Sequence, residues 1–171
     1  MFGYHGYPLR NEGSTVVEPL YEVAAHCADL LSSPELAREK DAIQHGATTV
    51  WEHSISVANA CARLAHALPI RLKVRPLLRG ALLHDYFLYD WHDRTTSRPH
   101  HATRHGSYAR ANAERDFAIT EHEGDIIQSH MFPLEGFPAS REACLLALAD
   151  KGISLAEALA GLRARMGVRR G

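Results

Sequence analysis

The stretch Gly80-Ala81-Leu82-Leu83-His84-Asp85 places an imidazole and a carboxylate side by side at the end of an apolar run. The apolar spacing predicts a helix over residues 74–87, on which His84 faces the same way as Leu77 and Ala81. Asp85 would lie about 100° further round this helix. Because a charge on a core-facing surface is costly to desolvate unless a partner compensates it, the pair indicates a cation site. A single His-Asp dipeptide equally fits a buried histidine beside a local carboxylate cap.

The composition is that of a globular protein. The chain has 171 residues, of which 46% are hydrophobic and 23% charged, and this length allows one domain over residues 1–171. A net charge of -1 lacks the basic field that duplex nucleic acid would select. Residues 1–13 resemble neither a signal peptide nor a membrane span, so no membrane partner is expected. Cys27, Cys61 and Cys144 are widely spaced, which predicts core thiols in a reducing, cytoplasmic location.

Helical spacing of apolar residues dominates the chain and predicts an all-α fold. We expect helices over residues 15–31, 34–43, 49–68, 74–87, 108–117, 121–132, 141–151 and 154–166, and no strands. Ser33, Thr120, Ser140 and Ser154 are the expected caps of four of these helices. The expected core spans about residues 45–155, with helices of 1–44 packed on it and a C-terminal helix and basic tail at 154–171.

Twelve histidines are present, and three of them fall on apolar helix faces. These are His53, His84 and His130, each of which also fits a hydrogen-bonded core histidine when taken alone. Asp150 lies near the predicted helix end at residue 151, where a carboxylate opposes the helix dipole and calls for a positive neighbour. Together with His105 and Asp85, these are six side chains, more than the four ligands that one tetrahedral ion takes. The set therefore predicts two ions a few ångström apart, with Asp85 as the bridge.

The order of these residues resembles the HD-domain superfamily of metal-dependent phosphohydrolases, over about residues 45–155. The Leu-Leu-His-Asp and Leu-Ala-Asp-Lys contexts are similar to those of the family. The resemblance implies an all-α, HD-domain-like helical bundle with the metal site in its core. The first metal would be bound by His53, His84, Asp85 and Asp150. A second metal, shared through Asp85, would be bound by His105 and His130, with His101 as a further ligand or a phosphate contact.

Two branch-specific signatures of the family are missing. Leu88 stands three positions after the aspartate of the pair, where the 5′-deoxynucleotidase branch has an acidic residue. The Gly-Tyr-Pro signature of the cyclic-di-GMP phosphodiesterase branch is also missing near the pair. The activity of neither branch carries over to this chain.

The segment between the pair and His105 is polar, aromatic and basic, and is long for a simple connection. Its arginines, Arg94, Arg98 and Arg104, suit bidentate contacts to phosphate oxygens, and Lys151 is a fourth candidate for substrate binding. Asp90 and Asp93 are candidate proton donors to the leaving oxygen. Solvated surface positions are the alternative for each of these side chains.

The leading functional prediction is hydrolysis of a phosphomonoester or phosphodiester, nucleotides included, by a metal-activated water. Asp85, Asp90 and Asp93 are the catalytic candidates, and the cofactors are divalent ions drawn from Fe, Mn, Zn, Co, Ni and Mg. One alternative is a non-catalytic, metal-stabilised module that regulates or binds a ligand. Another is a di-iron oxygenase of the same superfamily. A closed coordination shell would favour the regulatory module, and an open position facing a cleft would favour hydrolysis.

Overall fold

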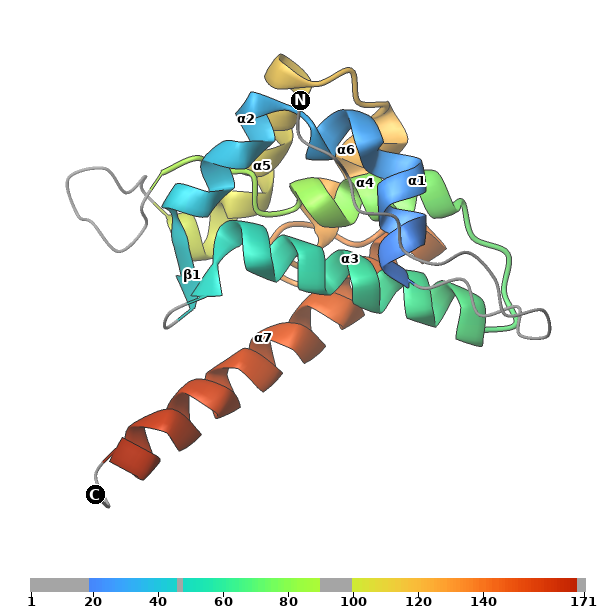
Figure 1. Ribbon diagram of the computed structural model, residues 1–171. Coiled ribbons are helices and arrows are strands. Elements are labelled where there is room, and N and C mark those ends of the chain that lie inside the picture. The colour runs from blue at the N-terminus through green and yellow to red at the C-terminus, as the bar shows by residue number, and fades with distance from the viewer. Residues whose placement is uncertain (1–18, 46–47, 90–99, 169–171) are drawn as a thin grey trace, which may run out of the picture.

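The computed structural model describes residues 19–45, 48–89 and 100–168, and this part of the chain is all-α, as predicted (Figure 1). The helices are α1 (Pro19–Leu31), α2 (Pro34–Ala37), α3 (Val50–Ala67), α4 (Val74–Leu83), α5 (His101–Asp116), α6 (Glu121–Ser129) and α7 (Arg141–Val168). A 3-10 turn, η1 (Arg38–Asp41), and two short strands, β1 (Ile43–His45) and β2 (Thr48–Thr49), complete the described elements. Among these residues, no helix is both long and apolar enough to cross a membrane.

The core is built around α4, the helix that leads into the His-Asp pair. Its leucines Leu77, Leu78, Leu82 and Leu83 are fully or almost fully buried. Helix α4 contacts α1, α3, α6 and α7. A Cβ atom at Gly80 would collide with the side chain of Ile126, so the absence of a side chain lets α4 and α6 approach closely. The apolar run that leads into His84 and Asp85 therefore lies at the centre of the bundle.

Threonine caps fix where two of the site-bearing helices begin. The hydroxyl of Thr49 accepts the backbone N–H of Glu52, whose carboxylate accepts the backbone N–H of Thr49. Thr120 and Glu123 form the same reciprocal capping box at the start of α6, which confirms the sequence prediction there. Such boxes satisfy two backbone donors that a helix start leaves without partners.

The segment after α2 departs from the predicted helix over residues 34–43. Helix α2 ends at Ala37, η1 follows, and Ala42 adopts an extended conformation (φ -108°, ψ 135°). Strand β1 then pairs antiparallel with β2, with Ile43 opposite Thr49. The expectation of no strands was wrong because strands of three and two residues are too short to show period-two alternation. This pairing positions Gln44, which is only 7% exposed.

The C-terminal region is one helix, α7, rather than two helices divided near residue 153. Gly152 lies inside it, since a single glycine costs a helix only about 1 kcal/mol relative to alanine. Ser154 does not cap a new helix, and its hydroxyl donates to Oδ1 of Asp150 at 3.2 Å. The C-terminal half of α7 projects from the bundle with Leu155, Leu159 and Leu162 exposed (Figure 1). The predicted separate helix and tail at 154–171 is thus corrected, and residues 169–171 lie outside the described residues.

Three further helix boundaries differ from the prediction, and one of them is the end of α6, which lies at Ser129 and not at residue 132. Helix α5 begins at His101, seven residues before the predicted start, so His101 and His105 are one helical turn apart. Helix α4 ends at Leu83, and His84 is its C-cap.

Two of the three cysteines occupy the core as expected. Cys27 and Cys61 are buried, and burial raises the pKa of each thiol to about 12. Cys144 is exposed on α7, contrary to its predicted core position.

Candidate metal centre

Two of the site histidines, His84 and His130, are held by the same local arrangement. Each directly follows the last residue of a helix, α4 or α6, and keeps helical backbone angles. Nδ1 of His84 donates to the carbonyl of Ala81 at 2.8 Å, and Nδ1 of His130 donates to that of Ile127 at 2.6 Å. A helix end leaves such carbonyls without backbone partners. Because a carbonyl only accepts, the proton of each neutral ring is on Nδ1 and the lone pair is on Nε2.

The other two histidines, His53 and His105, come from within helices but are oriented in the same sense. Nδ1 of His53 on α3 lies 3.1 Å from Oε2 of Glu157 on α7. Nδ1 of His105 on α5 lies 3.2 Å from the carbonyl of His101, one turn earlier. All four histidines therefore engage Nδ1 with the protein and direct Nε2 toward a common centre.

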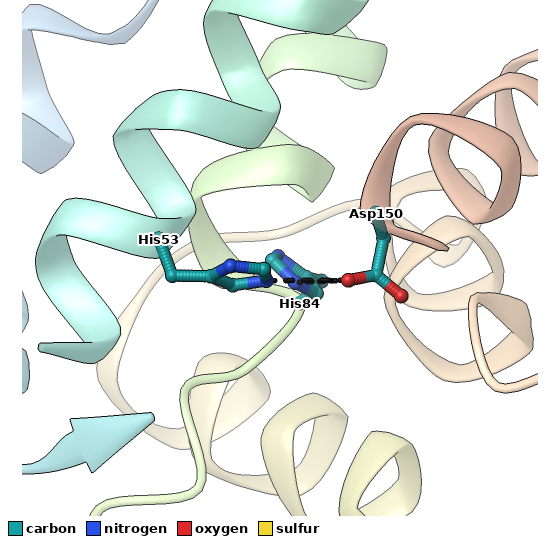
Figure 2. Close-up of side chains that lie close together, drawn as sticks. All are labelled: His53, His84 and Asp150. Carbon is teal, nitrogen blue, oxygen red and sulfur yellow. Dashed lines mark hydrogen bonds and ion pairs between the residues drawn. The ribbon is translucent and has the colours of Figure 1, made fainter. Parts of the chain in front are cut away.

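The first group of donor atoms gathers His53, His84 and Asp150 from three helices (Figure 2). Oδ1 of Asp150 lies 3.2 Å from Nε2 of His53 and 3.7 Å from Nε2 of His84. Oδ2 of Asp85 completes the group, 3.3 Å from Nε2 of His84 and 3.8 Å from Nε2 of His53.

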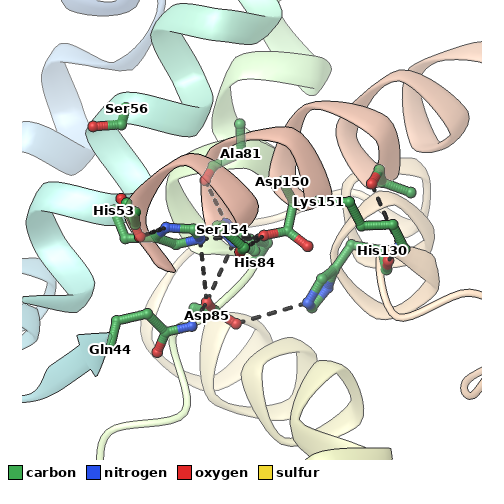
Figure 3. A network of polar contacts seen from close by, with 12 residues as sticks. Gln44, His53, Ser56, Ala81, His84, Asp85, His130, Asp150, Lys151 and Ser154 are labelled. Atoms are coloured by element: carbon green, nitrogen blue, oxygen red, sulfur yellow. Dashed lines mark hydrogen bonds and ion pairs between the residues drawn. The ribbon is translucent and has the colours of Figure 1, made fainter. Parts of the chain in front are cut away.

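The second group, His105 and His130, lies at the other carboxylate oxygen of Asp85, and Figure 3 shows the contact between Asp85 and His130. Oδ1 of Asp85 is 3.1 Å from Nε2 of His105 and 3.7 Å from Nε2 of His130. The two Nε2 atoms of His105 and His130 are 3.0 Å apart. Each carboxylate oxygen of Asp85 thus faces a different set of donors, which is the arrangement expected of a bridge between two ions.

The donor atoms fit divalent ions. Nitrogen and oxygen ligands about 2.0–2.2 Å from one ion lie about 3.0–3.5 Å from each other, close to the spacings found here. With Nδ1 protonated, the lone pairs of His105 and His130 face each other at 3.0 Å, a repulsive contact unless a proton or cation lies between them. Nε2 of His84 and Oδ1 of Asp85 are buried and form no hydrogen bond with any described residue. A bound cation would satisfy both atoms.

Comparison with known protein families gives an independent result. The family model described as HD domain matches residues 50–152. The chain belongs to the HD-domain family. Members of this family bind divalent metals and are generally metal-dependent hydrolases. No curated protein and no solved structure gave a significant match.

The two carboxylates among the donor groups of this HD domain, Asp85 and Asp150, favour the ionised form. Burial opposes ionisation of Asp85, but the neighbouring His84 and His105 outweigh it and hold its pKa well below the usual value. Burial likewise opposes ionisation of Asp150, but the hydrogen bond to His53 and the neighbouring ring of His84 outweigh it and lower its pKa. Asp150 is within α7 and not at its end, so its carboxylate does not oppose the helix dipole there, contrary to the prediction. The positive neighbours expected beside Asp150 are His53 of α3 and His84, which follows α4.

The four histidines differ in their affinity for protons. Burial would lower the pKa of His53, but hydrogen bonds to Asp150 and Glu157 outweigh it and raise the pKa to about 9. Burial, together with the nearby His84, lowers the pKa of His130 to about 3. His130 is therefore neutral at physiological pH, the form in which imidazole binds a metal.

His101, Lys151 and Arg104, which the sequence also singled out, are not members of the two donor groups of the HD domain. Nδ1 of His101 is 2.7 Å from the hydroxyl of Tyr89, and its ring stacks on His105 with centroids 5.0 Å apart. Nζ of Lys151 donates to the carbonyls of His130 and Ala147, so it links α7 to the end of α6. Arg104 is exposed on α5. The remaining predicted residues, Asp90, Asp93, Arg94 and Arg98, lie outside the described residues.

Three residues that the sequence did not single out contribute to this region, and all lie outside the matched segment 50–152. Nε2 of Gln44 donates to Oδ2 of Asp85, and Glu157 holds His53. Glu39 is buried near the pair, where His84 and Asp85 influence its pKa. Glu157 follows Asp150 by seven residues, a same-face spacing that would have identified it had one continuous helix been predicted. Gln44 and Glu39 have no comparable sequence signal, because the β1–β2 pair and η1 were not predicted.

Proposed function

We propose that this HD-domain protein is a phosphohydrolase that cleaves a phosphomonoester or phosphodiester at a two-metal site. The observation that carries the proposal is the position of Asp85. Its two carboxylate oxygens face separate donor groups, with His53, His84 and Asp150 on one side and His105 and His130 on the other. This geometry suits a carboxylate shared by two ions a few ångström apart.

The reaction adds water across a phosphate ester: the water oxygen forms a new P–O bond, the ester P–O bond breaks, and the leaving oxygen takes a proton. Divalent ions held by the two donor groups would lower the pKa of a water and neutralise charge on the phosphate oxygens. The protein keeps Asp85 and Asp150 ionised and the four Nε2 atoms oriented. Gln44 and Glu157 position Asp85 and His53. Asp90 and Asp93 remain predicted proton donors.

The test is an assay of the full chain loaded separately with Mn, Fe, Co, Ni and Zn, against an aryl phosphate and its bis-ester. We expect turnover of one or both esters, and a loss of at least about a hundredfold in Asp85→Ala, because both ions lose a ligand. Asp125→Asn on α6, away from the donor groups, is the matched control. It should retain its rate.

Two outcomes would favour the alternatives. Stoichiometric metal binding without turnover of either ester would favour a non-catalytic regulatory module. Chemistry that requires oxygen, seen only with iron-loaded protein in air, would favour an oxygenase.

A further inference from the structure

A cavity of about 230 Å³ adjoins the metal centre on the side of η1. Asp85 forms part of its wall, together with Arg38, Glu39 and Asp41 of η1. Apolar parts of the wall come from Val50 and Phe87. Pockets for drug-sized ligands run from about 300 to 1,000 Å³, so this cavity suits a smaller molecule.

Glu39 is the unusual member of the wall. Its side chain is only 2% exposed, and neither carboxylate oxygen has a hydrogen-bond partner among the described residues. Burying a carboxyl group with both oxygens unpaired is unfavourable, so native proteins rarely keep one without a reason. A ligand that donated a hydrogen bond from within the cavity would satisfy Glu39.

The rest of the wall indicates what kind of ligand would do so. Asp85 is shared with the metal centre, so one end of a molecule in the cavity would reach the ions. The guanidinium of Arg38 offers donors to an anionic oxygen. Val50 and Phe87 offer apolar contact to a short carbon chain. The cavity thus combines sites for a phosphate, a few carbon atoms and a hydrogen-bond donor.

We propose that this cavity binds the organic part of a small phosphate ester and that Glu39 accepts a hydrogen bond from its hydroxyl or ammonium group. The inference rests on the proposed function, because it assumes that phosphate is held at the metal centre. It adds a residue that selects the substrate, from a segment that precedes the family match at residue 50.

The test uses phosphonates, which are not hydrolysed, and so measures binding without turnover. Propylphosphonate, 3-hydroxypropylphosphonate and 3-aminopropylphosphonate are titrated calorimetrically into the metal-loaded full chain. We expect the hydroxyl or the amino compound to bind about three- to tenfold more tightly than propylphosphonate, which is the factor that one buried hydrogen bond contributes. The better of the two identifies the donor group.

Three variants assign the preference to Glu39. Glu39→Leu should remove it. Glu39→Gln, which keeps the size and one acceptor oxygen, should remove a preference for the amine but retain part of one for the hydroxyl. Glu35→Gln makes the same chemical change on an exposed position of α2 and should leave the preference intact. A thermal melt of each variant verifies that it is folded.

The inference is overturned if the wild-type protein binds the three phosphonates equally or binds none of them, or if Glu39→Leu keeps the preference. These results are independent of the assay for hydrolysis. A Glu39-dependent preference in a protein that hydrolyses no ester would leave the binding site standing and refute only the phosphohydrolase proposal.

Discussion

At the scale of single residues, the site depends on how each histidine uses its two nitrogens. One nitrogen is held by a carbonyl or a carboxylate of the protein, and the other is left for the centre. In three of the four cases the acceptor is a carbonyl three or four residues earlier, so the orientation follows from the helix that carries the histidine. His53 is the exception, because its acceptor, Glu157, comes from another helix.

Glu157→Ala should weaken metal binding by about 10- to 100-fold, because the ring of His53 would lose the group that orients it. The measurement is competition for Zn²⁺ against a chromophoric chelator. Glu114→Ala, a half-exposed glutamate on α5, serves as the control and should bind Zn²⁺ as the wild type does. Equal affinities in the two variants would show that Glu157 does not position His53.

Glu39 should make the metal-free protein less stable as pH rises. Burial raises the pKa of Glu39 well above its usual value of 4.5, so the folded state keeps a proton that the unfolded state releases above about pH 4.5. The unfolded state is therefore favoured progressively as pH increases from 4.5 toward the folded pKa. Glu39→Gln removes this linkage. We expect it to raise the melting temperature at pH 7 by about 2–4 °C or more and to have a smaller effect at pH 4.5.

The comparison is made by differential scanning calorimetry in the presence of a chelator. Taking the difference between variant and wild type cancels the titration of the histidines, provided that they titrate alike in both. A gain that does not change between pH 4.5 and pH 7 would contradict the proton linkage.

At the scale of elements, α7 matters because it is continuous. Asp150 and Glu157 lie seven residues apart, or two turns, and therefore face the same way toward α3. A break near residue 153 would separate Asp150, which faces His53 and His84, from Glu157. Glu157 is the side chain that orients His53. The continuity of this helix thus joins the donor group to its support.

Two glycine substitutions test these helices in opposite directions. Gly152→Ala should stabilise the protein by about 1 kcal/mol, because alanine favours a helix and its Cβ would meet no atom within 4 Å. Gly80→Ala should destabilise it by about 1–3 kcal/mol, since the added Cβ would collide with Ile126 across the α4–α6 contact. Urea unfolding measures both changes. A loss of stability in Gly152→Ala would indicate that the helix is interrupted there.

At the scale of the whole molecule, the centre connects elements that are distant in sequence. Its donors come from α3, the end of α4, α5, the end of α6 and α7, and these helices form most of the bundle. Ions bound at the centre would hold these helices together, so metal occupancy and folding stability should be coupled.

Removing the metal should therefore lower the melting temperature. A metal present at about 100 times its dissociation constant stabilises the folded state by about 2.7 kcal/mol, which corresponds to roughly 5–10 °C for a chain of this size. The measurement is a thermal melt of Zn-loaded protein with and without excess chelator. His84→Ala should largely lose the response. An equal response in this variant would place the stabilising metal elsewhere.

Much of the fold and the site was predictable because the signals are local. Apolar spacing identified the helices, and threonine followed three residues later by glutamate identified the start of α6. The histidines on apolar stripes, the His84-Asp85 pair and Asp150 were identified by position and order, and the structure brings them together. Each of these features is encoded within a few turns of one helix, where side-chain direction follows from spacing alone.

Other features were decided only by the tertiary structure. The roles of Gln44, Glu39 and Glu157 depend on the short β1–β2 pair, on η1 and on an unbroken α7, where local propensity is weak or points the other way. Gly152 and Ser154 suggested a helix boundary that packing against α3 and α6 overrides. The sequence by itself determined which side chains can bind metal, because donor chemistry belongs to the residue. Only the folded chain determined what surrounds them, because contacts between distant segments depend on how the helices pack.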